Sequence, residues 1–124
     1  MASTVNSEAM KNRTKQFALV LIRLCRTLPQ NAEARIISRQ LLRSATSVAA
    51  NYRAVCRARS TADFTSKLGL VLEEADETLF WLELLVDAGI APRGQISAPL
   101  DEANQLVSIF VASLRTAKGL KSEI

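Results

Sequence analysis

The chain has 124 residues, a formal net charge of +4, 48% hydrophobic residues and 23% charged residues, which is the balance of one ordinary globular domain. It contains no histidine, which excludes Ser–His–Asp and Cys–His catalytic arrangements and removes the commonest metal ligand. Only four glycines and three prolines interrupt it, and this scarcity of breakpoints favours long helices over many short strands.

The first predicted helix covers about residues 7–28, and Pro29 ends it because proline disfavours helical geometry in the residue before it. Its apolar residues recur at steps of three or four, with Thr14 in the one gap, so they share one helix face. They are Met10, Phe17, Leu21, Leu24 and Leu28.

The second predicted helix begins near Asn31, a good N-cap, and runs to about Arg57. Small residues fill positions 44–51, which lets a neighbouring helix approach closely. The apolar line of this helix consists of Ile37, Leu41, Ala45, Val48, Tyr52 and Cys56.

The third predicted helix starts at a capping-box-like pair, Ser60 and Asp63, and stops at Gly89. Its core-facing line consists of Phe64, Leu68, Val71, Ala75, Leu79, Leu82 and Val86. It also carries a second apolar set, namely Leu70, Phe80, Trp81, Leu84 and Leu85. Since one stripe is enough for a bundle core, the second set predicts a subunit contact, which we assign to Trp81, Leu84 and Leu85.

Residues 90–99 contain Pro92, Gly94 and Pro99 and are predicted to form a loop. A fourth helix is then expected from about Pro99 to Lys118, with Gly119 marking its end. Long helices with short connections predict an all-α fold, an antiparallel up-down-up-down four-helix bundle. We expect a single domain over residues 1–124, with flexible ends at about 1–6 and 119–124.

Chemical motifs are scarce in the sequence. Cys25 and Cys56 lack the paired spacing of a zinc or redox motif and are predicted to be buried as small hydrophobes. There is no phosphate-binding glycine loop, and we expect no metal site, no cofactor and no enzymatic activity. No signal peptide and no apolar run of membrane-spanning length is visible, so we expect a cytoplasmic protein with no membrane association.

Charge is strongly segregated along the chain. Residues 31–60 hold six arginines and one glutamate, whereas residues 61–89 hold one lysine and seven acids. Arg35, Arg39 and Arg43 share one helix face, and Arg53 and Arg57 repeat the four-residue spacing. Like charges at this spacing repel by about a few tenths of a kcal/mol per pair, so a compensating partner is expected.

Two partners could supply that compensation. One is the acidic third helix, because structural ion pairs are the commoner use of such charges. The other is a nucleic-acid phosphate backbone, which arginine binds through its planar fork. The candidate phosphate-binding residues are Lys11, Arg13, Lys15, Arg39, Arg43, Arg53, Arg57, Arg59 and Lys67.

The sequence resembles a known bacterial family in two places. Residues 42–52 (LRSATSVAANY) resemble the second-helix signature of the "four helix bundle protein" family, the intervening-sequence proteins of large-subunit ribosomal RNA. Residues 63–69 (DFTSKLG) and 73–85 (EEADETLFWLELL) resemble its third helix. The likeness covers about residues 10–118. In the family the asparagine is often followed by Ile-Ala-Glu-Gly, whereas here Asn51 is followed by Tyr52, Arg53, Ala54 and Val55, so no role of that glutamate carries over.

The resemblance implies an antiparallel bundle that assembles into a homo-oligomeric ring, a pentamer, with a role in binding RNA or DNA. Relatives of the fold include the accessory variability determinant of diversity-generating retroelements, a basic ring that works with a reverse transcriptase. The matching positions Arg43, Asn51, Glu74 and Glu77 are candidates for a polar network. The leading hypothesis is therefore a non-enzymatic ring protein that binds nucleic acid or assists a nucleic-acid enzyme. The alternative is a structural or protein-interaction module, in which Arg39, Arg43, Arg53 and Arg57 are consumed in ion pairs.

Overall fold

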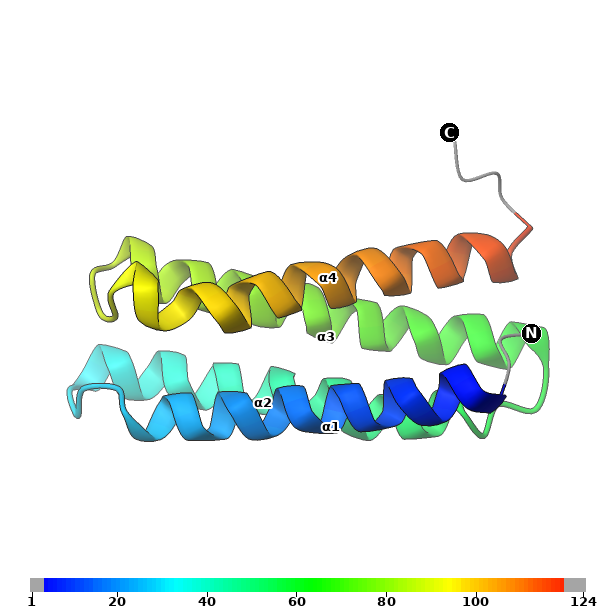
Figure 1. Cartoon of the computed structure of the whole chain (residues 1–124), viewed down its shortest axis with the longest axis horizontal. Coiled ribbons are helices and arrows are strands. Elements are labelled where there is room, and N and C mark those ends of the chain that lie inside the picture. The colour runs from blue at the N-terminus through cyan, green and yellow to red at the C-terminus, as the bar shows by residue number, and fades with distance from the viewer. Residues whose placement is uncertain (1–3, 120–124) are drawn as a thin grey trace.

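The computed structural model describes residues 4–119 of the chain and consists of four long α-helices. They are α1 (Thr4–Arg26), α2 (Ala32–Val55), α3 (Thr61–Asp87) and α4 (Arg93–Ala117). The chain reverses direction at each short connection, so the helices run antiparallel (Figure 1). The predicted all-α up-down-up-down bundle is confirmed. Of the predicted flexible ends, residues 1–3 and 120–124 lie outside the described part, and α1 already begins at Thr4.

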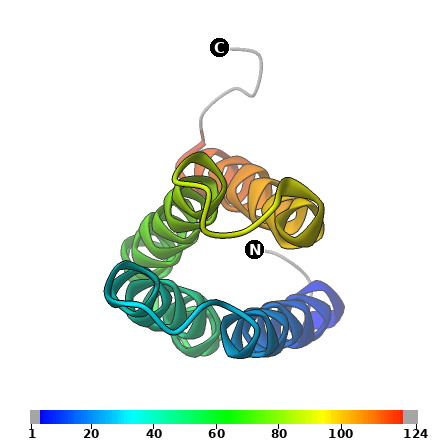
Figure 2. The same ribbon diagram turned by 90° about the vertical axis from the view of Figure 1, so that its left-hand side faces the viewer.

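Each helix packs mainly against its neighbours in sequence, so the bundle is built from the pairs α1–α2, α2–α3 and α3–α4. Helices α1 and α4 make few contacts with each other, and the end-on view shows them as the widely spaced pair (Figure 2). At one end of the bundle lie the α2–α3 turn, the start of α1 and the end of α4 (Figure 1).

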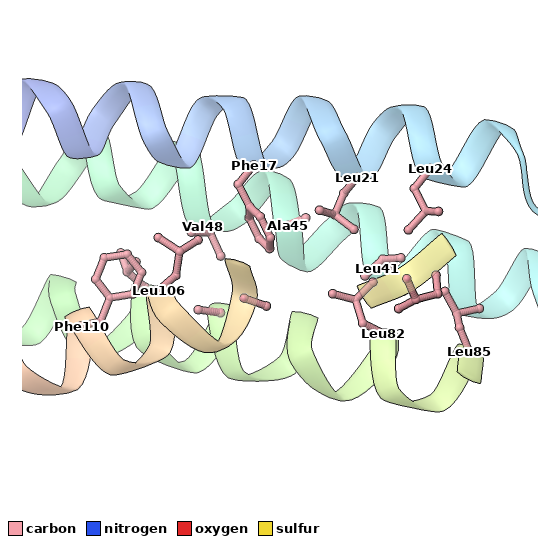
Figure 3. Close-up of a cluster of buried hydrophobic side chains, with 14 of the residues drawn as sticks. Phe17, Leu21, Leu24, Leu41, Ala45, Val48, Leu82, Leu85, Leu106 and Phe110 are labelled. Atoms are coloured by element: carbon pink, nitrogen blue, oxygen red, sulfur yellow. The ribbon is translucent and has the colours of Figure 1, made fainter. Parts of the chain in front are cut away.

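The core is a continuous column of buried aliphatic and aromatic side chains from all four helices (Figure 3). Phe17 and Leu21 of α1 meet Leu41 and Val48 of α2, and Phe110 of α4 lies further along the column. Phe17, Leu21, Leu41 and Val48 are positions that the three- and four-residue apolar spacing predicted to face inward. Burial of such side chains, at about 1.5–3 kcal/mol each, drives the helices together.

Local signals set the helix ends as expected. The Asn31 side chain accepts a hydrogen bond from the backbone N–H of Ala34 at 2.9 Å, and Ser60 Oγ accepts one from Asp63 at 3.0 Å. Gly89 has a φ of 72°. Its N–H donates to the Val86 carbonyl at 3.0 Å, and the N–H of Ile90 donates to the Leu85 carbonyl at 3.0 Å. This pair of bonds is a Schellman motif, which requires the left-handed residue that glycine supplies.

The predicted loop over residues 90–99 is wrong beyond Pro92, because α4 begins at Arg93 and Pro99 lies inside it. Pro99 cannot donate to the carbonyl of Gln95, so the helix loses one internal hydrogen bond there. Ile96, Pro99 and Ala103 are nevertheless all buried at three- and four-residue steps. Packing of this inward line against the core sustains the helix through the proline.

The cysteine prediction is half wrong. Cys25 is half-buried, but Cys56 is exposed at the end of α2. The inward line of α2 ends one residue earlier, at the buried Val55. Cys56 therefore lies in the turn, where the helical spacing used for the prediction no longer applies.

Candidate nucleic-acid interface

A basic groove lies on the α2–α3 surface at the end of the bundle that holds the α2–α3 turn. Its volume is about 630 Å³, and it is lined by Ala50, Arg53, Ala54, Arg57, Arg59, Asp63 and Lys67. We call these residues the basic groove. It combines four cations with one carboxylate, so its side chains carry a net positive charge.

The α2–α3 turn positions these cations. Arg53 is exposed in the last turn of α2, and Arg57 is exposed two residues after the end of that helix. Arg59 follows in the turn, and its backbone N–H donates to Asp63 Oδ2 at 3.1 Å. The predicted capping pair is thus present in modified form, because Asp63 reaches back to Arg59 rather than to Ser60.

Asp63 also holds Lys67, whose Nζ lies 2.8 Å from Asp63 Oδ2. The hydrogen bond from Lys67, followed by that from the Arg59 backbone, lowers the pKa of Asp63 below its ordinary value. Asp63 is therefore ionised at neutral pH and offsets the charge of Lys67. None of the arginines of the groove forms an ion pair within residues 4–119, although the charge of Arg59 also contributes to lowering the pKa of Asp63.

Four of the nine predicted phosphate-binding cations have carboxylate partners. Arg13 donates from Nε to Glu102 Oε2 at 2.7 Å and from Nη2 to Oε1 at 2.9 Å, which is a bidentate pair between α1 and α4. Lys11 lies 2.8 Å from Glu8, and Arg43 pairs with two glutamates of α3. The fourth is Lys67, paired with Asp63 as described above.

The remaining five cations form no ion pair within residues 4–119: Lys15, Arg39, Arg53, Arg57 and Arg59. Only the last three belong to the basic groove. Arg39 lies more than three turns from Arg53 along α2, and Lys15 lies on α1. The structure thus brings together four of the nine candidates, Arg53, Arg57, Arg59 and Lys67.

The predicted polar network forms between α2 and α3, but without one member. Arg43 Nη1 donates to Glu74 at 3.1 Å, and Arg43 Nη2 donates to Glu77. The Asn51 side chain, two turns further along α2, makes no hydrogen bond in the described part of the chain.

The network includes a residue that the sequence analysis assigned elsewhere. Trp81 Nε1 donates to Glu77 Oε2 at 2.9 Å, one turn along the same helix. The four-residue spacing of Glu77 and Trp81 could have revealed this contact. The hydrogen bond from Arg43, followed by that from Trp81, lowers the pKa of Glu77 below its ordinary value.

The predicted subunit contact on α3 needs correction. Leu85 is 0% exposed and belongs to the core of the protomer, because it lies three residues after Leu82 on the same inward face. Trp81 and Leu84 are half-buried. The exposed apolar side chains of α3 are Leu70 (52%) and Phe80 (50%), and the Phe80 ring stands edge-on to Trp81 with centroids 4.9 Å apart.

A second hollow, of about 690 Å³, lies where α1 and α4 diverge. Apolar side chains such as Met10, Phe64 and Ile109 dominate its lining, and Arg13 lies at the same seam. No local pattern in the sequence indicates this hollow, because it depends on how far two helices distant in sequence stand apart. Its lining contains no nucleophile–base pair.

Residues 4–119 contain neither a metal-binding cluster nor a membrane-spanning helix. No group of three or more His, Cys, Asp or Glu residues is placed to hold a metal ion. None of the four helices is both long enough and apolar enough to cross a bilayer.

Comparison with known proteins identifies a family and a similar solved structure. The family described as 23S rRNA-intervening sequence protein matches residues 7–112. The crystal structure of a protein of unknown function from the S23 ribosomal protein family of Bacteroides thetaiotaomicron VPI-5482 is similar, with 32% identity and a TM-score of 0.78. The similarity covers 85% of this chain and 97% of that one. No curated protein matches the chain.

The Glu77–Trp81 hydrogen bond makes the single tryptophan a reporter of the α2–α3 ion pair. Because the pKa of Glu77 is lowered, Trp81 emission should titrate with a midpoint below the ordinary glutamate value of about 4.3. Arg43→Met should raise that midpoint, since it removes the main cause of the lowered pKa.

Arg39→Met is the matched control, because Arg39 is one turn away on α2 and has no ion pair in the described chain. It should leave the midpoint unchanged, and Glu77→Gln should abolish the transition. Far-UV circular dichroism identifies the pH range in which the helices stay folded. A midpoint that does not respond to Arg43→Met would contradict this arrangement.

Proposed function

The chain belongs to the 23S rRNA-intervening sequence protein family, and we propose that it is a non-enzymatic, self-associating protein that binds RNA or DNA through the basic groove. In this proposal it acts in the cytoplasm, either alone or as an accessory to a nucleic-acid enzyme. Its partners are further copies of itself, assembled as a ring, and a nucleic-acid backbone.

The observation that carries the proposal is the set of three exposed arginines that have no carboxylate partner within residues 4–119. Arg53, Arg57 and Arg59 surround one groove, and the one carboxylate there is already bonded to Lys67. No ion pair within residues 4–119 therefore offsets their mutual repulsion. Phosphate oxygens would offset it, and the guanidinium fork binds phosphate in bidentate fashion.

Self-association is supported by apolar side chains that the bundle leaves exposed. Phe80 and Leu70 on α3 are 50% and 52% exposed, and Ile36 on α2 is 61% exposed. Covering these side chains with another copy would remove apolar surface from water. Assembly would also multiply the charge of the basic groove, and binding to a polyanion would gain in proportion.

The absence of catalysis is proposed from composition, because the chain has no histidine and the basic groove has no nucleophile beside a base. The alternative function is a structural or protein-interaction module without nucleic-acid binding. It has the exposed Phe80 and Leu70 in its favour. Under this alternative, four arginines should be ion-paired: Arg39, Arg43, Arg53 and Arg57. Within the described chain, only Arg43 of these four forms an ion pair.

Charge reversal in the groove tests nucleic-acid binding. Arg53→Glu/Arg57→Glu should abolish binding of mixed-sequence RNA and duplex DNA at low salt, measured by fluorescence anisotropy. Arg35→Glu/Arg93→Glu is the matched control at the opposite end of the bundle (Figure 1). Both variants lower the formal net charge from +4 to zero, so a difference between them isolates position.

Wild-type binding should weaken steeply with salt, by a slope of about −0.9 in log K per log salt for each neutralised phosphate on duplex DNA. Undetectable wild-type binding at low salt would refute the proposal and favour the interaction module. Equal loss in the two variants would show that net charge, rather than the groove, governs binding.

Phe80→Glu tests self-association. The wild-type protein should have a solution mass, by light scattering after size exclusion, that is a multiple of 13.6 kDa, and Phe80→Glu should lower it toward one protomer. Val20→Glu is the control, since Val20 is an exposed apolar residue on α1 (41%) outside the proposed contact. A monomeric wild-type protein, or a variant that assembles unchanged, would rule out this contact.

A further inference from the structure

The lining of the basic groove is chemically narrow. It consists of three arginines, one lysine, one aspartate and two alanines. It offers no aromatic ring, and it offers no amide or hydroxyl side chain. A nucleic acid lying there would therefore meet charges and small apolar surfaces.

The aromatic side chains of the described chain lie elsewhere. Tyr52 is buried and stacks on Phe110 with ring centroids 6.0 Å apart, and Phe17 is in the core. Phe64 lines the α1–α4 hollow. Phe80 and Trp81 lie on α3 more than three turns beyond Lys67, toward the opposite end of the bundle.

This separation bears on the kind of nucleic acid that the groove accepts. Proteins that hold single strands combine a basic channel with aromatic rings on which the bases stack, and each stacked base contributes about 1–3 kcal/mol. A flexible strand must also be ordered when it binds, which costs conformational entropy. With no ring in the groove, nothing there offsets that cost.

A duplex presents the opposite case. Its phosphates are already fixed in a regular array, and its bases are stacked on one another. The cations of the groove are carried by an ordered backbone. Arg53 stands in the last turn of α2, Arg57 follows the C-cap of that helix, and Lys67 stands on the facing helix α3.

Arg59 completes the array from the turn. Its backbone N–H is tied to Asp63 at 3.1 Å, so the chain segment that carries it is anchored to the first turn of α3. The groove therefore presents cations on two helices and the turn between them. These cations face a regular array of phosphates in a duplex, so a duplex needs less ordering of the nucleic acid than a single strand does.

We infer that the basic groove binds the sugar–phosphate backbone of a double-stranded nucleic acid in preference to a single strand. The inference rests on the proposed function, and it names the class of nucleic acid that the groove takes. RNA and DNA duplexes share the chemistry that the groove recognises, so the experiment compares both.

The test uses the full-length protein and three probes of one length and sequence: an RNA duplex, a DNA duplex and an RNA single strand designed not to fold. Fluorescence anisotropy at low salt should show that both duplexes bind roughly tenfold more tightly than the single strand, or better. The reason is that the groove has no aromatic ring on which the bases of a single strand could stack. With three unpaired arginines, the slope of log K against log salt on duplex DNA should be as steep as about −2.7, or steeper.

Arg53→Glu/Arg57→Glu should remove duplex binding, and Arg35→Glu/Arg93→Glu should retain it. The single strand could instead bind as tightly as the duplexes or more tightly, and Arg53→Glu/Arg57→Glu could remove that binding. This result would overturn the duplex inference and leave the proposed function standing. Duplex binding that survives Arg53→Glu/Arg57→Glu would overturn the assignment to this groove. Absence of binding to all three probes would end both proposals.

Discussion

The close packing of α2 against α3 is the interaction on which the rest of the structure depends. Small side chains make it possible: Ser44 and Ala45 of α2 are fully buried, as are Ala75 and Thr78 of α3. Thr78 Oγ1 lies 2.9 Å from Ser44 Oγ, so the contact also satisfies two buried hydroxyls. This contact fixes the register of the two helices, and the register decides which charges meet.

The register explains why one arginine is neutralised and others are not. With Ser44 opposite Thr78, Arg43 lies beside Glu74 and Glu77. Because the helices are antiparallel, the last turns of α2 face the first turns of α3, where Asp63 is already bonded to Lys67. Segregated charge in the sequence thus becomes two regions of one helix pair, an ion-pair network near the middle and a basic groove at one end.

Much of this could be predicted from the sequence. Apolar spacing identified the helix faces, Asn31 and Ser60 identified two helix starts, and Gly89 identified a helix end, because each of these signals acts within one or two turns. The burial of Leu85 was also within reach of local spacing, because it lies three residues after the buried Leu82. Other features depend on longer-range geometry. Helix α4 extends through Pro99 because packing against the core buries its inward side chains. The Arg13–Glu102 pair joins residues 89 positions apart, and no local pattern could indicate it.

Arg13 and Arg43 are held in ion pairs, whereas Arg53, Arg57 and Arg59 share the basic groove and form no ion pair within residues 4–119. Side-chain Nε–Hε resonances of arginine in ¹⁵N-labelled protein test this division directly, residue by residue. On addition of an RNA duplex, the resonances of Arg53, Arg57 and Arg59 should shift, while those of Arg13 and Arg43 should stay in place. Shifts centred on Arg13 and Arg43, or no shift at any arginine, would contradict the account.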